Sequence, residues 1–475
     1  MSSDSPISPT LDQPESNQAS AAQTGHRREF AGSASPGTAD LWFLPLGGCG
    51  EIGLNLNLYG HDDAWLMVDC GIGFEREPGA RDRVIMPDPR FISERREQLT
   101  GLIITHAHED HIGAVARLWP ELRCPIYATP YTLDILKDKL AEQGLSDIPL
   151  HEVALEHART IGPFHVEWIN LTHSIVEPSA LLISTPAGKI FHTADWKLDE
   201  HPLVGHGYNR ERLASLGRED LRAVVCDSTN ANRPGRSVSE REVLDGLRRL
   251  IRPLKGRVVV TCFGSNIARL NSLCRIAKEC GRYVTLLGRS LEKRVASARR
   301  CGYWQNDHSL LQPFELGYLP PEESLIIATG SQGEERTALY RLARGSHRLL
   351  DLESGDNVIF SSKVIPGNEE AVATLIDKLT SRGINCVQEK DSELPIHASG
   401  HPYQEELMDL YSWTKPRMAI PVHGEPVHLA ANAQAAKDAG VPRQLVGRNG
   451  DLFTLAPFYK KQEAFAPTGR LTAQN

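Results

Sequence analysis

The sequence predicts an α/β fold in which a strand-rich domain is interrupted by a second α/β domain, and three observations support this prediction. Short apolar strands separated by loops run from about residue 41 to residue 240. Between 241 and 403 strands and helices alternate, which is typical of a parallel sheet covered by helices. A compact group of histidines and acids at 105–111 directly follows one of the apolar strands.

These changes of pattern divide the chain into four parts. Residues 1–38 are rich in Ser, Pro, Gln, Ala and Gly without apolar periodicity, so we expect a disordered tail. Residues 39–240 form the first part of the main domain, 241–403 the inserted domain, and 404–475 the completing part with a C-terminal tail.

Each predicted element rests on a local apolar pattern. In the main domain we expect a helix at 113–119 and strands at 64–69, 101–105, 165–171, 181–185, 189–193 and 221–226. In the inserted domain the expected helices are 239–252, 266–280, 291–301 and 369–382, and the expected strands are 257–261, 283–287, 324–328 and 357–361. A strand at 418–422 and a helix at 427–439 complete the main domain.

Charge is unevenly distributed along the chain. The formal net charge is −8, yet residues 241–300 carry 15 lysines and arginines against four acidic residues. This block is either a local phosphate-binding surface or the solvated faces of two amphipathic helices.

Composition also indicates the compartment. The nine cysteines are scattered without a C-x-x-C pair, which suggests reduced thiols. No apolar run approaches the roughly 20 residues of a membrane span, and no signal-peptide pattern opens the chain. We therefore expect a cytoplasmic protein without membrane partners.

The turn at 105–111 carries four candidate metal ligands within six positions, namely His106, His108, Asp110 and His111. Zn²⁺ favours imidazole and carboxylate ligands, and placing several in one turn lowers the entropy cost of bringing them together. The alternative is a polar helix start with incidental histidines.

Three further polar residues each follow a predicted strand: His173, Asp195 and His423. Together with the turn they would complete the ligand set of a two-metal hydrolase. By contrast, Gly48-x-Gly50-x-x-Gly53 matches the dinucleotide-binding pattern without the helix that pattern requires. We expect a glycine-rich turn near the site floor there, and no nicotinamide cofactor.

Nine sequence blocks together resemble the metallo-β-lactamase superfamily and, within it, the bacterial ribonuclease J family of β-CASP nucleases. The resemblance covers about residues 41–455. The blocks, in chain order, are PLGGCGEIGLN (45–55), THAHEDHIGA (105–114), HTADWKLD (192–199), DSTNANRPG (227–235), FGSNIARL (263–270), TGSQGEE (329–335), IPGNEE (365–370), HASGH (397–401) and IPVHGEPVHL (420–429).

The resemblance implies an αββα sandwich with an inserted β-CASP domain that closes over RNA. It also implies two zinc ions, with Mn²⁺ or Mg²⁺ as alternatives. His106, His108 and His173 would hold one ion, Asp110, His111 and His423 the other, and Asp195 would bridge them. Asp227, His401 and His423 would be the β-CASP motif residues.

The implied activity is hydrolysis of RNA phosphodiesters in mRNA decay and rRNA maturation, by a 5′→3′ exonuclease with endonuclease activity that leaves 5′-phosphates. Asp195 would hold the ions, Asp110 would orient the nucleophile, and His401 would protonate the leaving 3′ oxygen because its pKa suits neutral pH. Turns rich in small residues can present N–H groups to a terminal phosphate. The candidate substrate-binding residues are Ser265, Asn266, His397, Ala398, Ser399, Gly400 and His401.

Two features differ from the family pattern. The stretch that usually reads HSIPDS is here His173-Ser174-Ile175-Val176-Glu177-Pro178-Ser179. The family also carries a C-terminal domain of roughly a hundred residues that supports self-association. Here the sequence continues for only about twenty residues beyond Asp451, so we expect a form without that domain. A homodimer and partners in RNA decay are left open.

Two other readings compete with this one. The chain could be another metallo-β-lactamase-fold hydrolase that acts on DNA or a small ester, or a catalytically weak RNA-binding relative. The basic block and the HASGH and VHGE motifs disfavour a small substrate, and the filled ligand positions disfavour a weak relative. We therefore expect 5′-monophosphorylated single-stranded RNA as the substrate.

Overall fold

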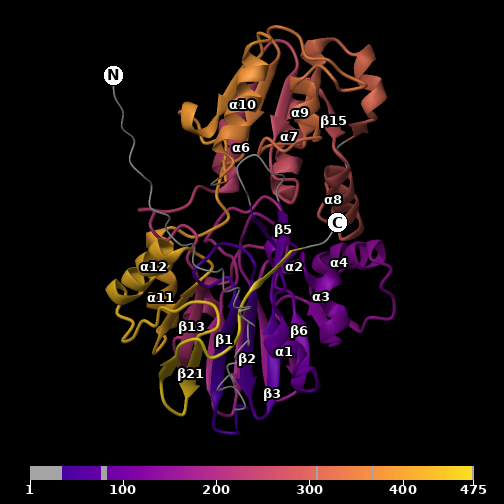
Figure 1. The fold of residues 1–475 in the computed structure, drawn as a ribbon. Helices are drawn as coiled ribbons and strands as arrows, with labels where there is room; N and C mark the ends of the chain where they lie inside the picture. Colours follow the sequence, from indigo (N-terminus) through magenta and orange to yellow (C-terminus); the bar gives the residue numbers. More distant parts are fainter. Residues whose placement is uncertain (1–34, 76–82, 306–308, 366, 473–475) are drawn as a thin grey trace, which may run out of the picture.

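The computed structural model describes residues 35–75, 83–305, 309–365 and 367–472. Figure 1 shows two parts, a sandwich of sheets below and an inserted lobe above it. Residues 1–34 of the predicted tail lie outside the described residues. Among the helices that are described, none is long and apolar enough to cross a membrane.

The first sheet of the sandwich has eight strands. In spatial order they are β22 (Lys460–Gln462), β21 (Leu452–Ala456), β1 (Leu41–Gly47), β2 (Leu56–His61), β3 (Ala64–Val68), β6 (Leu99–Ile103), β7 (Ile126–Ala128) and β8 (Leu150–Glu152). Its central strands are buried on both faces, which explains why they read as continuous apolar runs.

The second sheet has six strands. In spatial order they are β20 (Ala419–Val422), β13 (Leu221–Asp227), β12 (Gly188–His192), β11 (Ser179–Thr185), β10 (Phe164–Asn170) and β9 (Ala158–Ile161). Phe43 and Val68 of the first sheet belong to the same apolar core as Trp168 and Val225 of the second. The core between the sheets therefore holds the sandwich together.

Helices cover the outer face of each sheet, as expected for an αββα arrangement. The first sheet is covered by α1 (Arg90–Ser93), α3 (Val115–Leu122) and α4 (Pro130–Glu142). The second is covered by α5 (Arg210–Leu216), α11 (Gln404–Thr414) and α12 (Pro426–Asp438). The strands β4 (Gly73–Glu75), β5 (Arg83–Pro87) and β23 (Arg470–Thr472) form a small separate sheet.

The inserted lobe is a parallel six-stranded sheet with helices on both faces. Its strands, in spatial order, are β16 (Leu310–Leu311), β15 (Tyr283–Leu287), β17 (Ser324–Ala328), β14 (Val258–Thr261), β18 (Asn357–Phe360) and β19 (Asn385–Gln388). Helices α6 (Glu240–Ile251), α7 (Ile267–Glu279) and α8 (Arg289–Arg300) cover one face, and α9 (Ala338–Ala343) and α10 (Glu369–Thr380) cover the other. The alternation expected at 241–403 is therefore observed.

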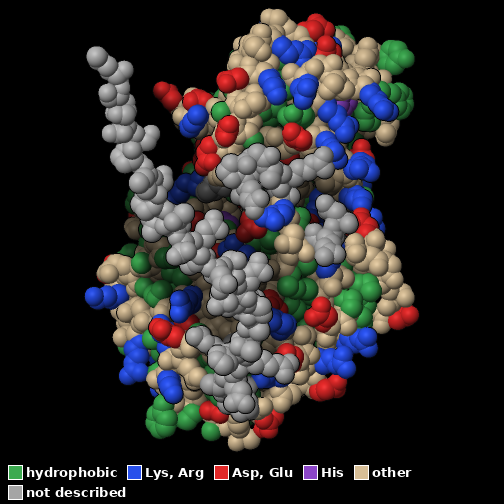
Figure 2. All heavy atoms as spheres, in the orientation of Figure 1, with side chains coloured by type: hydrophobic (Ala, Val, Ile, Leu, Met, Phe, Trp, Pro, Cys, Tyr) green, Lys and Arg blue, Asp and Glu red, His purple; other side chains and the backbone are tan. Residues whose placement is uncertain are grey.

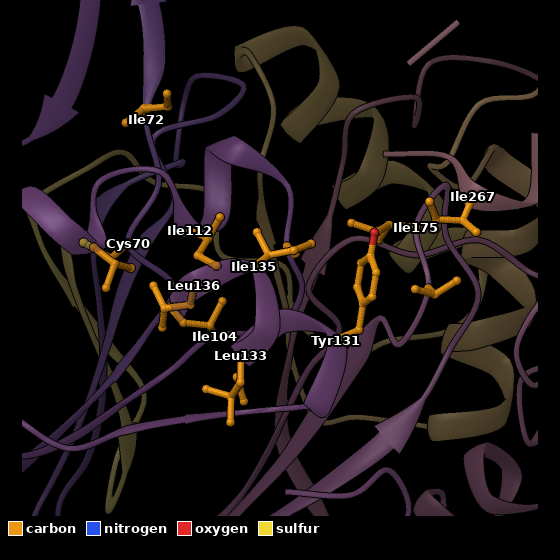
Figure 3. Close-up of a cluster of buried hydrophobic side chains, with 14 of the residues drawn as sticks. Cys70, Ile72, Ile104, Ile112, Tyr131, Leu133, Ile135, Leu136, Ile175 and Ile267 are labelled. Atoms are coloured by element: carbon orange, nitrogen blue, oxygen red, sulfur yellow. The ribbon is translucent and has the colours of Figure 1, made fainter. Parts of the chain in front are cut away.

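The lobe and the sandwich share one apolar core. Tyr131 of α4, Ile175 of the loop after β10 and Ile267 of α7 belong to the same buried cluster, and Figure 3 shows these side chains gathered together. Because burying each such side chain contributes about 1.5–3 kcal/mol, this shared core stabilises the seat of the lobe on the sandwich.

Candidate functional site

The strands of both sheets deliver polar residues to one edge of the sandwich. In the first sheet β3 and β6 are parallel, and Asp69 and His106 lie just beyond their carboxyl ends. In the second sheet β12, β13 and β20 are parallel, so that Asp195, Asp227 and His423 lie at the same edge. Strand β10 runs in the same direction as β12, because each pairs antiparallel with β11, and it leads into His173.

At three of these strand ends, a residue adopts the left-handed backbone conformation: Asp69 and His423 themselves, and Ala194 just before Asp195. The φ angles are +64° at Asp69, +50° at Ala194 and +52° at His423. A non-glycine residue in this region costs about 1–3 kcal/mol. Such strain at three strand ends that meet at one place is typical of a functional site.

The turn at 105–111 is held against the loop after β3. Residues Glu109–Ile112 form the single-turn helix α2, whose Glu109 and His111 carbonyls accept from Ile72 N and Cys70 N at 3.0 and 2.7 Å. A Cβ atom at Gly71 would lie 1.7 Å from the Asp110 carbonyl oxygen, so only glycine permits this contact.

A first donor group consists of His106, His108, His173 and Asp195. The Nδ1 atom of His108 lies 3.1 Å from Nε2 of His106 and 3.0 Å from Nε2 of His173. Oδ2 of Asp195 lies 3.9 Å from Nε2 of His106 and 3.7 Å from Nε2 of His173. Three ring nitrogens that converge on one point with a carboxylate are the donor set of a divalent ion such as zinc.

A second donor group consists of Asp110, His111, His423 and, again, Asp195. Oδ2 of Asp110 lies 3.2 Å from Nε2 of His423 and 3.5 Å from Nε2 of His111. Asp195 reaches both histidines, with Oδ2 3.2 Å from Nε2 of His111 and Oδ1 2.9 Å from Nδ1 of His423. Asp195 is thus the one carboxylate shared by both groups.

Burial keeps the imidazoles of the first group neutral. It lowers the pKa values of His106 and His108 well below the usual 6.5, with neighbouring histidines adding to the effect. It also lowers the pKa of His173 to about 4. Only a deprotonated ring nitrogen can bind a metal, so the group is ready for an ion at neutral pH.

The carboxylates of the second group stay ionised although they are buried. Burial alone would raise the pKa values of Asp110 and Asp195, but the neighbouring histidines, His111 foremost and then His423, together outweigh burial and hold both pKa values well below 3.8. Oδ1 of Asp195 is buried beside Nδ1 of His423, 2.9 Å away. Because a buried ionised carboxylate requires compensating positive charge, the position of Asp195 between the two groups fits a place beside bound cations.

Asp69 supports the ligands from behind, and the sequence prediction missed it. Oδ2 of Asp69 accepts from Nδ1 of His111 at 2.7 Å, and both carboxylate oxygens accept from Thr105 Oγ1 at 2.9 and 3.0 Å. Nδ1 of His106 lies 3.1 Å from that hydroxyl. Its position just after the strand at 64–68 is the signal that selected His173, Asp195 and His423, so the same rule could have found it.

Asp227 and His401 form a pair beside the donor groups. Nδ1 of His401 lies 2.7 Å from Oδ2 of Asp227, while Oδ1 of Asp227 accepts from the backbone and hydroxyl of Thr229 at 2.9 and 2.8 Å. Burial tends to lower the pKa of His401, but the Asp227 and Asp195 carboxylates together outweigh it and raise that pKa above 6.5. The two carboxylates therefore favour the protonated imidazolium.

Several predicted substrate-binding residues are engaged in structural bonds. Oδ1 of Asn266 caps α7 by accepting from Arg269 N at 2.9 Å, and its Nδ2 donates to Glu240 Oε1 at 2.9 Å. Ser399 Oγ accepts from Asn230 at 2.7 Å, and Ala398 is buried.

The remaining residues of the two candidate turns reach the donor groups or lie close by. Ser265 Oγ and the Gly400 carbonyl each contact a histidine of the first group, His108 and His173 respectively. Burial and the Arg269 guanidinium lower the pKa of His397 to about 3. Ser265 and Gly400 therefore place the two turns beside the donor groups.

Much of the basic block at 241–300 is neutralised by ion pairs. On α8, Arg294 lies 3.3 Å from Glu109, Arg300 pairs with Asp134 at 2.7 Å, and Lys293 pairs with Glu142. These pairs join α8 to the sandwich, and on the face drawn in Figure 2 basic and acidic side chains are mixed over the lobe. Three of the fifteen basic residues in this block therefore join the lobe to the sandwich.

Glu177, in the stretch that differs from the family pattern, also joins the two parts. Its Oε2 accepts from Tyr131 N at 2.8 Å, and its Oε1 accepts from the hydroxyl of Tyr303 at 2.7 Å. This carboxylate thus connects the loop of His173 to the residues that follow α8.

Comparison with protein families gives three matches along the chain. Residues 53–225 match the metallo-beta-lactamase superfamily, 255–379 match "Ribonuclease J, beta-CASP domain", and 395–445 match "Zn-dependent metallo-hydrolase RNA specificity domain". These matches confirm the predicted fold of a metallo-β-lactamase domain with a β-CASP domain, and they imply that the site uses divalent metal.

Individual relatives cover most of the chain. A ribonuclease J from Sinorhizobium meliloti is 43% identical over 91% of this chain and 77% of its own length. A ribonuclease J from Mycolicibacterium smegmatis is 40% identical over 85% of this chain and 73% of its own length. A ribonuclease J from Helicobacter pylori is 35% identical over 92% of this chain and 64% of its own length. A crystal structure of a protein of unknown function from Enterococcus faecalis V583 has the same fold, with a TM-score of 0.60 and 17% identity over 88% of this chain and all of that one.

Proposed function

Because the chain belongs to the ribonuclease J family of metal-dependent ribonucleases, we propose that it degrades single-stranded RNA from a 5′-monophosphorylated end and also cuts internally. The observation that carries this proposal is the placement of two donor groups sharing Asp195 next to the Asp227–His401 pair. We further propose two zinc ions per chain, with Mn²⁺ or Mg²⁺ as alternatives.

The seven ligand side chains would have different roles at the reacting phosphate. When bound, a pair of divalent ions would supply a hydroxide near neutral pH and positive charge beside the phosphate oxygens. His106, His108 and His173 would hold one ion, while Asp110, His111 and His423 would hold the other. Asp195 contacts both groups and would fix their spacing, and Asp110 would orient the nucleophile.

His401 would donate the proton that the leaving 3′ oxygen requires. Its Nδ1 is held by Asp227, which leaves Nε2 as the ring nitrogen that can meet the substrate. The side chain is 19% exposed, whereas Asp227 is fully buried. Asp227 would thus act as the positioning carboxylate, and cleavage on the 3′ oxygen side leaves a 5′-phosphate on the product.

The small-residue turns at 264–266 and 397–401 would bind the phosphates next to the scissile bond. Asn266 and Ser399 are engaged in structural hydrogen bonds, so their side chains hold the turns in shape. Phosphate contacts carry no sequence code, and we expect little base preference.

The test is side-by-side digestion of 5′-monophosphate RNA, 5′-triphosphate RNA and DNA of one sequence, each with separate 5′-end and internal labels. We expect the 5′-monophosphate RNA to release labelled mononucleotides, the triphosphate to block that release, and internal cuts to persist on both RNAs. His108→Ala should abolish cleavage with little loss of RNA binding, while His157→Ala, at an exposed histidine, should change neither.

Each competing function predicts a different outcome. Equal turnover of DNA and RNA would indicate a general nuclease. Hydrolysis of small phosphate esters alone would indicate a small-substrate hydrolase. RNA binding without cleavage would indicate an inactive relative. Within the leading proposal, the protein acts in the cytoplasm in mRNA decay and rRNA maturation.

A further inference from the structure

Two ligands of the first donor group are held by residues that enter from outside the sandwich. Nε2 of His108 lies 3.0 Å from Oγ of Ser265, in the turn that begins α7. Nδ1 of His173 lies 2.6 Å from the carbonyl oxygen of Gly400, in the loop that returns from the inserted lobe. These contacts bridge 157 and 227 positions of the sequence.

The chemistry of imidazole fixes the direction of both bonds. A ring nitrogen that binds a metal must present its lone pair, so the other nitrogen carries the proton. His108 faces the donor group with Nδ1, and its Nε2–H must therefore donate to Ser265. His173 faces it with Nε2, so that its Nδ1–H donates to Gly400.

The other histidines on this side of the site are supported from within the sandwich. His111 donates to Asp69, and His106 lies next to Thr105, whose hydroxyl binds the same carboxylate. The hydrogen-bond partners of the histidine ligands therefore come partly from the sandwich and partly from the inserted lobe and its returning loop.

Both outer partners are rigidly placed. Ser265 precedes Asn266, whose side chain caps α7 and donates to Glu240, and Arg269 binds the same Glu240 at 2.9 Å. Gly400 is packed directly on the ligand, since a Cβ atom there would lie 2.5 Å from Cε1 of His173. Neither partner can shift without moving the lobe or the returning loop.

We propose that the inserted lobe completes the first metal position, because seating it sets the ligating tautomers of His108 and His173. Metal affinity at that position and closure of the lobe over RNA are then linked, and by reciprocity RNA tightens the metal. This inference rests on the proposed function, since it takes the first donor group to be a metal position.

The test compares Ser265→Ala with Ser265→Thr, which keeps the hydroxyl, and with Ser290→Ala at an exposed serine of α8. Zinc binding is measured by competition with a chromophoric chelator, and thermal unfolding checks each fold. Loss of an outer partner typically weakens a metal site about 10–100-fold. We expect Ser265→Ala to weaken one of two zinc equivalents by that factor, with Ser265→Thr and Ser290→Ala close to wild type.

A second arm measures the linkage itself. Phosphorothioate-protected 5′-monophosphate RNA should tighten the weaker zinc equivalent in the wild type and have a smaller effect in Ser265→Ala. Gly400→Ala, whose Cβ displaces the His173 ring, should lose the same equivalent. Unchanged zinc affinity in both variants would overturn the inference while leaving the proposed function intact. A wild-type protein that binds no divalent ion would overturn the proposed function itself.

Discussion

Nδ1 of His401 lies 2.7 Å from Oδ2 of Asp227, and both residues border the Asp195 carboxylate that the two donor groups share. Asp227 therefore orients the imidazole of His401, while the neighbouring Asp195 faces the ligands of both donor groups. This division of roles between two adjacent carboxylates connects the metal position to the protonation of the leaving group.

Replacing His401 by alanine should slow RNA cleavage about 10²–10⁴-fold in kcat, the usual contribution of a general acid. RNA binding should change little. A 3′-bridging phosphorothiolate substrate, whose sulfur leaves without a proton, should recover most of the lost rate. An equal loss on both substrates would contradict the assignment of His401 as the proton donor.

The carboxylate of Asp69, which lies behind the ligand His111, should affect the affinity for metal rather than the affinity for RNA. Asp69→Asn removes the ionised partner of His111, and we expect zinc affinity at the second position to fall about 10–100-fold. Chelator competition measures this effect. Asp63→Asn, at an exposed turn, provides the control, and wild-type zinc affinity in Asp69→Asn would show that the Asp69 carboxylate does not support His111 as a ligand.

The buried Glu240–Arg269 pair should make stability depend on pH. Burial tends to raise the pKa of Glu240, but Arg269, Lys197 and Asn266 together outweigh it and lower that pKa from the usual 4.5 to about 2. The carboxylate therefore stabilises the fold fully above about pH 4.5, and this contribution is lost as the pH falls toward 2.

Urea unfolding of wild type and Glu240→Gln at pH 7 and pH 3.5 tests this dependence. We expect a difference of about 3–5 kcal/mol at pH 7, because the variant leaves a buried arginine unpaired, and a smaller difference at pH 3.5. The exposed Glu142, paired with Lys293, gives the control: Glu142→Gln should cost under about 1 kcal/mol. A pH-independent difference for Glu240→Gln would contradict the pKa argument.

The contact between Tyr303 and Glu177 should stabilise the seat of the lobe. Tyr303→Phe removes one hydrogen bond to a buried carboxylate, and such bonds contribute about 1.5–3 kcal/mol. The free energy of unfolding in urea should fall by that amount, whereas Tyr283→Phe, at a half-exposed tyrosine, should leave it unchanged. Equal stabilities of the two variants would remove this role from Glu177.

Local patterns were sufficient to predict much of the fold. The strands at 283–287 and 324–328 have the predicted bounds, and the helix expected at 239–252 is observed as Glu240–Ile251 with a Ser239 capping box. The helices at 130–142 and 404–414 were not predicted, although Leu407, Leu410 and Tyr411 in the second have the spacing of one helix face.

The candidate site was predictable to the extent that it depends on local spacing and strand ends. The turn at 105–111 brings its ligands together by sequence proximity, while His173, Asp195 and His423 follow strands whose carboxyl ends share one edge. The contact of Ser265 with His108 depends on how two domains pack. No short-range pattern encodes such a contact, so the sequence did not predict it.

Seven side chains are expected to hold two metal ions, both of which are needed to cleave RNA. The most direct measurement strips the protein with a chelator, returns zinc stepwise, and records bound metal and cleavage of 5′-monophosphate RNA on the same samples. We expect two zinc equivalents per chain and full activity only when the second equivalent is bound. Asp195→Asn should neither bind two equivalents nor reach full activity. Full activity in the stripped protein, or saturation at one equivalent, would contradict this expectation.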